Sequence, residues 1–218
     1  VTNPHTYKSS SNFPDFIDHI SKRGHEIASH NWKHEWIPFF TEKQNRKSFE
    51  RSKLALERSI KHRQEVIGFC PPHSKPSTWI RQGAFSLGDR ALWPFFKMAN
   101  LENVLKLLNE LNYKWIRISL NSIKYKTGFK NRNLTGKVYK YKNMLILENF
   151  YTGFDNIVQE YILHSTNEYY IITAHPAMLS KDKNKMESSM YFEEFLNKFA
   201  NNSEYEFISP MDLINHNL

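Results

Sequence analysis

The stretch Gly24–Pro38 reads Gly-His-Glu-Ile-Ala-Ser-His-Asn-Trp-Lys-His-Glu-Trp-Ile-Pro, and it decides the expected fold because it joins a strand to two histidines. The segment Glu26–Ser29 predicts a short strand that delivers His30 at its end, and His34 follows four residues later. If the backbone coils there, the two imidazoles share a face with Cβ atoms about 6 Å apart. Their ring nitrogens could then converge on one metal ion. Because 10 histidines placed at random give roughly half a pair at this spacing, the pair needs structural context.

The composition predicts one globular domain over residues 1–218. Hydrophobic residues make up 40% of the chain and aromatic residues 15%, which is enough to fill one substantial core. The single cysteine, Cys70, excludes an internal disulfide framework. No apolar run approaches the roughly 18 residues needed to span a bilayer.

The net charge of +8 could attract polyanions. However, the lysines are scattered without a long block, and no zinc-finger or RNA-binding aromatic signature accompanies them. We therefore expect no nucleic-acid partner.

Strands and helices alternate along the chain. Helices are expected after Pro14, from Thr41 to about Arg63, after Asn100, over Phe154–Ser165 and over Glu187–Ala200. Thr41 with Gln44 forms a capping-box pattern at the start of the second helix. The helix after Asn100 carries an apolar stripe made of Leu101, Val104, Leu105, Leu108 and Leu111. Strands are expected over Val66–Phe69, Tyr113–Leu120, Lys137–Tyr141, Met144–Asn149, Tyr169–Ala174 and Tyr205–Ile208, with a turn at Pro210–Ile214 and an insertion near residues 77–99. This order predicts a parallel α/β fold or barrel.

Three polar stretches follow expected strands, namely His30–His34, Cys70–Ser74 and His175. In parallel α/β folds the chemistry lies in loops at the carboxyl ends of the strands. The shared location supports the histidine pair as part of a site.

The stretch around His30, then Gly-Phe-Cys-Pro-Pro-His-Ser, then Ile-Ile-Thr-Ala-His-Pro, together resemble the polysaccharide deacetylase family, the NodB-homology domain of carbohydrate esterase family 4. The resemblance spans nearly the whole chain and implies a distorted (β/α) barrel. It also implies a divalent metal, with zinc expected, that is held by an Asp and by the two histidines that match His30 and His34.

The same resemblance implies the other roles in the site. His175 matches the acid that returns a proton to the departing amine, and the loop with Pro72 and His73 matches the segment that shapes the site and faces the developing oxyanion. Trp32 either stacks on a sugar ring or packs the rim. The implied reaction removes an N-acyl group, acetyl above all, from an amino sugar of a cell-surface or envelope polysaccharide. The resemblance thus favours a cell-envelope or secreted location, and the sequence also leaves a cytoplasmic location open.

Two features depart from the family pattern. Its first, Asp-containing motif has no match, and Asp15 and Asp18 fall inside an expected helix, so we expect that N-terminal strand and motif to lie upstream of Val1. Cys70 stands where the family commonly has an Arg that steadies the base carboxylate, and a thiol cannot form a bidentate charge-assisted pair.

These departures leave other readings open. The chain could be a catalytically inactive carbohydrate-binding or assembly protein, or a hydrolase of small or lipid-linked amides. Cys70 could be a nucleophile activated by His73, although the two intervening prolines favour a structural loop. The sequence does not indicate an oligomeric state.

Overall fold

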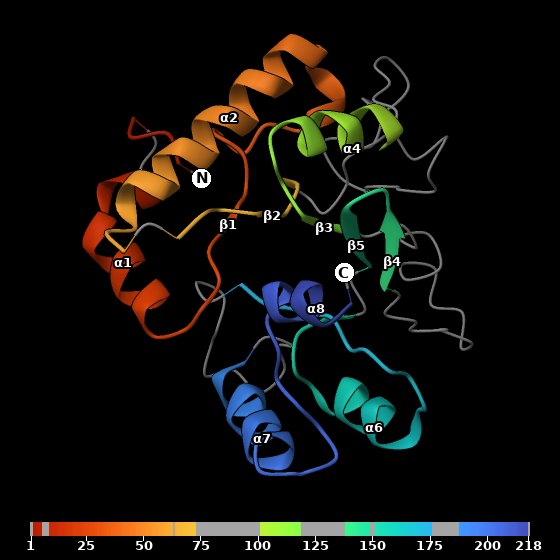
Figure 1. Ribbon diagram of the computed structural model, residues 1–218. Coiled ribbons are helices and arrows are strands. Elements are labelled where there is room, and N and C mark those ends of the chain that lie inside the picture. The colour runs from red at the N-terminus through yellow and green to blue at the C-terminus, as the bar shows by residue number, and fades with distance from the viewer. Residues whose placement is uncertain are drawn as a thin grey trace. The chain divides into compact units, whose positions relative to one another are not determined.

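The computed structural model describes residues 2–5, 9–62, 64–72, 101–118, 138–148, 151–175 and 188–217 (Figure 1). Its helices are η1 (Ser10–Asn12), α1 (Pro14–Lys22), η2 (Ile37–Phe39), α2 (Glu42–Ser59), α4 (Leu101–Glu110), α6 (Asn156–His164), α7 (Ser189–Phe199) and α8 (Pro210–Asn217). Its strands are β1 (Ala28–Ser29), β2 (Gly68–Phe69), β3 (Trp115–Ile118), β4 (Val138–Tyr141), β5 (Met144–Glu148), β6 (Tyr151–Thr152) and β7 (Ile172–Thr173). The expected alternation of strands and helices is confirmed.

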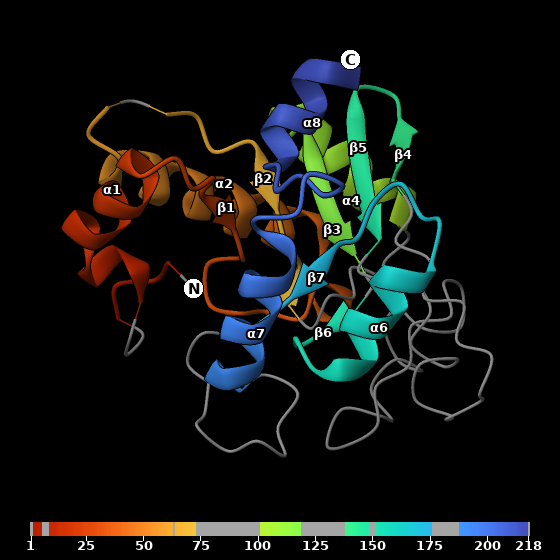
Figure 2. The same ribbon diagram turned by 90° about the horizontal axis from the view of Figure 1, so that it is seen from below.

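The described strands form two open sheets. One has five strands in the order β1-β2-β3-β5-β4, in which β1, β2 and β3 are parallel. The other consists of the parallel pair β6 and β7 (Figure 2). The α/β class is thus confirmed, whereas the described strands do not close into the expected barrel.

The chain divides into two compact units. The first comprises Val1–Arg132, Tyr139–Ile146 and Ser209–Leu218, and the second comprises Asn133–Val138 and Leu147–Ile208. The expectation of one domain over residues 1–218 remains a prediction, and the expected insertion near 77–99 lies outside the described residues. Within the part of the chain that the structure describes, no helix has both the length and the apolar character needed to cross a bilayer.

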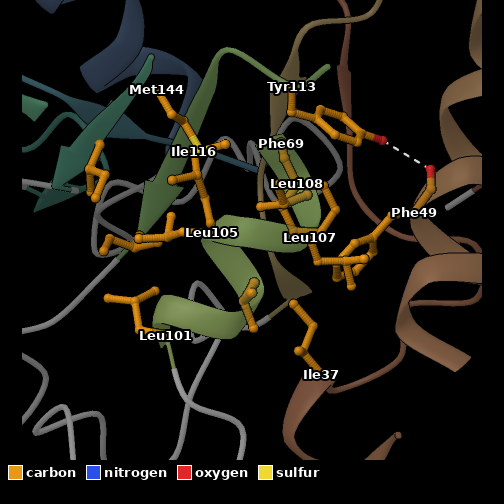
Figure 3. Packing of buried hydrophobic residues seen from close by; sticks show 13 residues of the cluster. Ile37, Phe49, Phe69, Leu101, Leu105, Leu107, Leu108, Tyr113, Ile116 and Met144 are labelled. Atoms are coloured by element: carbon orange, nitrogen blue, oxygen red, sulfur yellow. Dashed lines mark hydrogen bonds between the residues drawn. The ribbon is translucent and has the colours of Figure 1, made fainter. Parts of the chain in front are cut away.

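The core of the first unit lies between its sheet and the helices α2 and α4 (Figure 3). It consists of Ile37, Phe49, Phe69, Leu101, Val104, Leu105, Leu107, Leu108, Tyr113, Ile116, Ile118, Met144 and Ile146. The apolar stripe expected after Asn100 is confirmed, because four of its leucine and valine positions are buried in α4. The Tyr113 hydroxyl donates a hydrogen bond of 2.9 Å to the Phe49 carbonyl, which ties β3 to α2.

Helix α2 begins with the expected capping box. The Gln44 N–H donates to Thr41 Oγ1 at 3.3 Å, and the Thr41 N–H donates to Gln44 Oε1 at 2.9 Å. Two orphan donors at the helix start are thereby satisfied. The helix ends at Ser59, a few residues earlier than expected.

Two expectations near the C-terminus are wrong. Tyr205–Ile208 forms no strand, and Phe207 and Ile208 are exposed there by 58% and 40%, so this apolar run has no sheet to cover it. The expected turn after it is the start of helix α8. Pro210 occupies the first helical position, where its missing N–H costs nothing. The Asp212 N–H donates to Ser209 Oγ at 3.1 Å, and the Ser209 N–H donates to Asp212 Oδ2 at 3.0 Å, which completes a cap.

Candidate metal and hydrolase site

The parallel strands of the first unit bring three polar side chains into one row. The last paired residues of β1, β2 and β3 are Ser29, Phe69 and Ile116. The next residue of each strand is His30, Cys70 and Arg117 respectively, and we call these three the strand-end row. The Cys70 N–H donates to the Ser29 carbonyl at 2.8 Å, so the parallel ladder continues into the row.

The strand-end row lies on the face of the sheet that points away from the core of Figure 3. Successive side chains of a strand point to opposite faces. Phe69 and Ile116 belong to that core, so Cys70 and Arg117 point the other way. The preceding row on this same face contains Gly68 and Trp115, and the indole lies directly over the glycine.

His30 is fixed by a hydrogen bond across the row. Its Nδ1 lies 2.6 Å from the Cys70 carbonyl oxygen, which can only accept, so Nδ1 carries the proton. Burial lowers the pKa of His30 to about 4, with further lowering from His34 and Arg117, so the ring is neutral near pH 7. A neutral ring protonated at Nδ1 has its lone pair on Nε2, which is the arrangement typical of a metal-binding histidine.

His34 lies close to His30 because a loop, and not a helix, connects the two residues. Asn31 and His34 both have left-handed backbone conformations, with φ of 67° and 62°. The two imidazole centroids are nevertheless 4.9 Å apart with an angle of 68° between the rings. The proximity expected of the pair is therefore present, although one helical turn is not the cause.

Polar side chains of helix α2 hold this loop in place. The Ser52 hydroxyl donates to the Asn31 carbonyl at 3.2 Å, and the Ser48 hydroxyl donates to Asn31 Oδ1 at 3.3 Å. Ser48 Oγ in turn accepts from the Trp32 N–H at 3.1 Å. Both serines are buried in α2. They form a hydrogen-bonded support under the histidine pair, which sets where the two rings stand.

The proline loop after β2 is only partly described. Pro71 and Pro72 are buried, whereas His73 lies outside the described residues. Burial raises the pKa of the Cys70 thiol, which opposes formation of a nucleophilic thiolate. This supports a structural role for Cys70 within the row.

The other expected site residues are placed as follows. Trp32 is half-buried in the histidine loop, while its neighbour Trp36 is buried and packs edge-on against Phe39 with ring centroids 4.8 Å apart. His175 is exposed just after β7 in the second unit. The roles of Trp32 and His175 therefore remain predictions.

Among the described residues, Asp18 does not supply the carboxylate of the expected ligand set. Asp18 lies in α1, where its carboxylate pairs with Lys22 Nζ at 2.7 Å and accepts from the Lys61 N–H at 2.8 Å. Across the described residues, no group of three or more His, Cys, Asp and Glu side chains is placed to hold a metal ion. His30 and His34 could therefore supply at most two ligands of a tetrahedral site, and their imidazole centroids lie 4.9 Å apart.

Arg117 was missed by the sequence reasoning. The sequence did contain an indication of it. In the buried strand Trp115–Ile118, Arg117 points to the face of the sheet opposite to that of Ile116 and Ile118. What the sequence could not supply is the register that sets Arg117 beside Cys70.

Comparison with known proteins confirms the resemblance. Residues 3–92 match the sequence model of the family described as Polysaccharide deacetylase. A 70-residue segment, 32% of the chain, is 33% identical to Chitin deacetylase 1 of Saccharomyces cerevisiae and spans 23% of that protein. The chain therefore spans less than a quarter of the length of this curated relative.

Two solved structures share the fold. A Mycobacterium smegmatis chain assigned as a polysaccharide deacetylase superposes with a TM-score of 0.60 at 14% identity, covering 95% of this chain and 68% of the other. A CE4 family pseudoenzyme from Bacillus anthracis gives 0.50 at 12% identity, covering 93% and 51%. These likenesses show an α/β fold of the deacetylase type.

Proposed function

From this likeness to the polysaccharide deacetylases, we propose that the protein is a divalent-metal-dependent hydrolase that removes an N-acyl group, acetyl above all, from an amino sugar of a cell-surface or envelope polysaccharide. The observation that carries the proposal is the geometry of His30. Its Nδ1–H is bound to the Cys70 carbonyl at 2.6 Å, which leaves Nε2 as the lone-pair donor beside the His34 ring.

His30 and His34 would hold the metal, and zinc is the ion that best suits two imidazole ligands. When bound, such an ion polarises the amide carbonyl and lowers the pKa of its water toward neutrality. Because His30 is neutral near pH 7, it is ready to ligate without first losing a proton.

The remaining roles are assigned by the resemblance. His175 would protonate the departing amine, and the backbone N–H of His73, together with Pro72, would border the developing oxyanion. Trp32 would contact the sugar ring. The base and the third ligand would be a carboxylate that the described residues do not provide.

The proposal is tested by zinc content and by acetate release from N-acetylglucosamine oligomers. The variant His30→Ala/His34→Ala should lose bound zinc and all chelator-sensitive turnover. His19→Ala, which changes an exposed histidine of α1, should keep both and serves as the matched control. Equal zinc in the wild type and the double variant would refute the metal site.

The second candidate is a catalytically inactive carbohydrate-binding or assembly protein. It is favoured by Cys70 at the position of the family Arg and by the absence of a third ligand among the described residues. It predicts binding of the oligomers with no acetate release at any zinc concentration, whereas turnover that a chelator abolishes would exclude it.

A further inference from the structure

Helix α2 carries positive charge on the face that points away from the core. Its buried positions are Asn45, Ser48, Phe49, Ser52, Leu56 and Ser59. The opposite face contains four exposed cations and one exposed leucine, namely Lys43, Lys47, Arg51, Leu54 and Arg58. At about 100° per residue, these five positions fall within an arc of roughly 80°. They therefore form one narrow row, and we call its four cations the α2 stripe.

The ion pairs of α2 are made by its other charged side chains. Arg46 pairs with Glu110. Lys53 Nζ lies 2.9 Å from Glu65 Oε1 and 3.8 Å from Glu57 Oε1. Among the described residues, no carboxylate forms an ion pair with a member of the α2 stripe. Its four positive charges thus face solvent without a counter-charge from the described part of the chain.

The stability of the helix does not explain this arrangement. Lys43 is the second residue of α2, where the helix dipole disfavours a cation. Lys43 and Lys47 are four residues apart, as are Lys47 and Arg51, and like charges at this spacing repel each other. Arg58 alone lies in the last turn, where a cation is favoured. A bound anion would relieve the repulsion among the other three.

The shape of the charged row limits what can bind to it. Cations four residues apart are separated by about 6 Å along the axis, and the whole row is about 22 Å long. Glu50 and Glu57 border the row on one side. A flat anionic membrane would meet these carboxylates as well as the cations, whereas a linear polyanion can follow the row alone. A nucleic-acid strand would also stack its bases on aromatic rings, and the row contains Leu54 and no aromatic residue.

We propose that the α2 stripe is a docking surface for an acidic polysaccharide, whose carboxylates neutralise the four cations. The choice of a sugar polymer rests on the proposed function, whereas the preference for a linear polyanion does not. Lysine and arginine bind carboxylates through charge-assisted hydrogen bonds. The stripe lies on the other side of α2 from Ser48 and Ser52, which hold the histidine loop. Docking therefore holds the protein on an acidic polymer and leaves the histidine pair free.

The experiment measures the Kd for an end-labelled oligogalacturonate by fluorescence anisotropy. The affinity of the wild type should fall at least about tenfold between roughly 50 and 200 mM NaCl. Lys43→Gln/Lys47→Gln/Arg51→Gln should raise the Kd roughly 10- to 100-fold. Its urea midpoint should be equal to or higher than that of the wild type, because repulsion is removed. Lys43→Arg/Lys47→Arg/Arg51→Lys keeps the charges and should bind like the wild type.

The matched control removes the same charge from exposed positions on other elements of the first unit. It is Arg23→Gln/Lys106→Gln/Lys140→Gln, and it should keep most of the affinity. Equal Kd values for the two triple glutamine variants would show that net charge alone decides binding and would overturn the inference. So would a wild type that does not bind oligogalacturonate, or that binds oligothymidylate or phosphatidylserine vesicles more tightly.

The same variants separate this inference from the proposed function. Acetate release from neutral N-acetylglucosamine oligomers should be the same in the wild type and in the stripe variant, because the histidine pair is unchanged. If the wild type releases no acetate but binds oligogalacturonate through the α2 stripe, the proposed function fails and the docking surface stands. If it releases acetate but does not bind oligogalacturonate, the docking surface fails alone.

Discussion

Replacing Gly68 by alanine tests the packing beneath the strand-end row. A Cβ built at Gly68 would lie 2.1 Å from Cζ2 and 2.3 Å from Cε2 of Trp115, so the indole must move by about 1.3 Å to reach an ordinary contact of 3.4 Å. The ring cannot move freely, because its Nε1–H donates to the half-buried Glu26 carboxylate at 2.6 Å. The substitution therefore perturbs two neighbouring strands and a part-buried hydrogen bond.

The expected cost follows from these two effects. Overpacking of a core position costs roughly 1–3 kcal/mol, and loss of a hydrogen bond to a charged group costs roughly 1.5–3 kcal/mol. The gain from a stiffer unfolded chain offsets about 0.4–1 kcal/mol of this. Gly68→Ala should thus lower the free energy of unfolding by roughly 2–5 kcal/mol, measured by urea titration with far-UV circular dichroism at constant m-value.

Two further variants make the measurement specific. Gly24→Ala has nothing within 4 Å of the new Cβ, but its φ of +87° is left-handed, so it should cost only about 1–2 kcal/mol. In a Trp115→Leu background, Gly68→Ala should cost much less than in the wild type, which gives a coupling energy between contacting residues. A Gly68→Ala variant within 0.5 kcal/mol of the wild type would refute the steric reasoning.

Substitutions at three other positions have defined outcomes. Burial raises the pKa of Glu26 above its ordinary 4.5, so its contribution to stability is full below that pH and is lost as pH rises through the raised value. Glu26→Gln should therefore flatten the fall in the urea midpoint above pH 4.5, and an unchanged slope would contradict this. Tyr113→Phe removes the buried bond to the Phe49 carbonyl and should cost roughly 1–2 kcal/mol in the same assay, whereas a neutral effect would show that the carbonyl finds another donor. Asn31→Gly keeps the left-handed backbone but loses the contact with Ser48. Asn31→Ala should lower the free energy of unfolding by about 1 kcal/mol more than Asn31→Gly, because alanine is strained in this conformation. Equal thermal midpoints of the two variants would argue against strain at this position.

The elements that the sequence predicted correctly depend on contacts close in the chain. The capping box of Thr41 and the apolar stripe of α4 are both local patterns, and both are confirmed. Helix α8 was missed because Pro210 was interpreted as part of a turn, although Ser209 and Asp212 form a local cap around it. The segment Tyr205–Ile208 has the composition of a strand. A strand also needs a neighbouring strand to pair with, and composition does not show whether one is present.

In the site, too, features set by neighbouring residues were predicted, whereas features set by tertiary contacts were not. The spacing of His30 and His34 indicated their proximity, yet the left-handed conformations of Asn31 and His34 and the serine supports from α2 are tertiary features. Arg117 was missed for a related reason. Its neighbour in the row is decided by the register between β2 and β3, which no single segment encodes.

The carboxylate of Glu26 has a consequence for how the chain folds. One of its hydrogen-bond partners is the Met211 N–H at the start of α8, 185 residues away in the sequence. During synthesis from the N-terminus, this acceptor must wait for 185 further residues to emerge, and such distant contacts are slow to form. Glu26 Oε2, two residues before β1, therefore stays hydrated until α8 docks, so folding intermediates of this protein should expose the part of the sheet around Glu26 and Trp115.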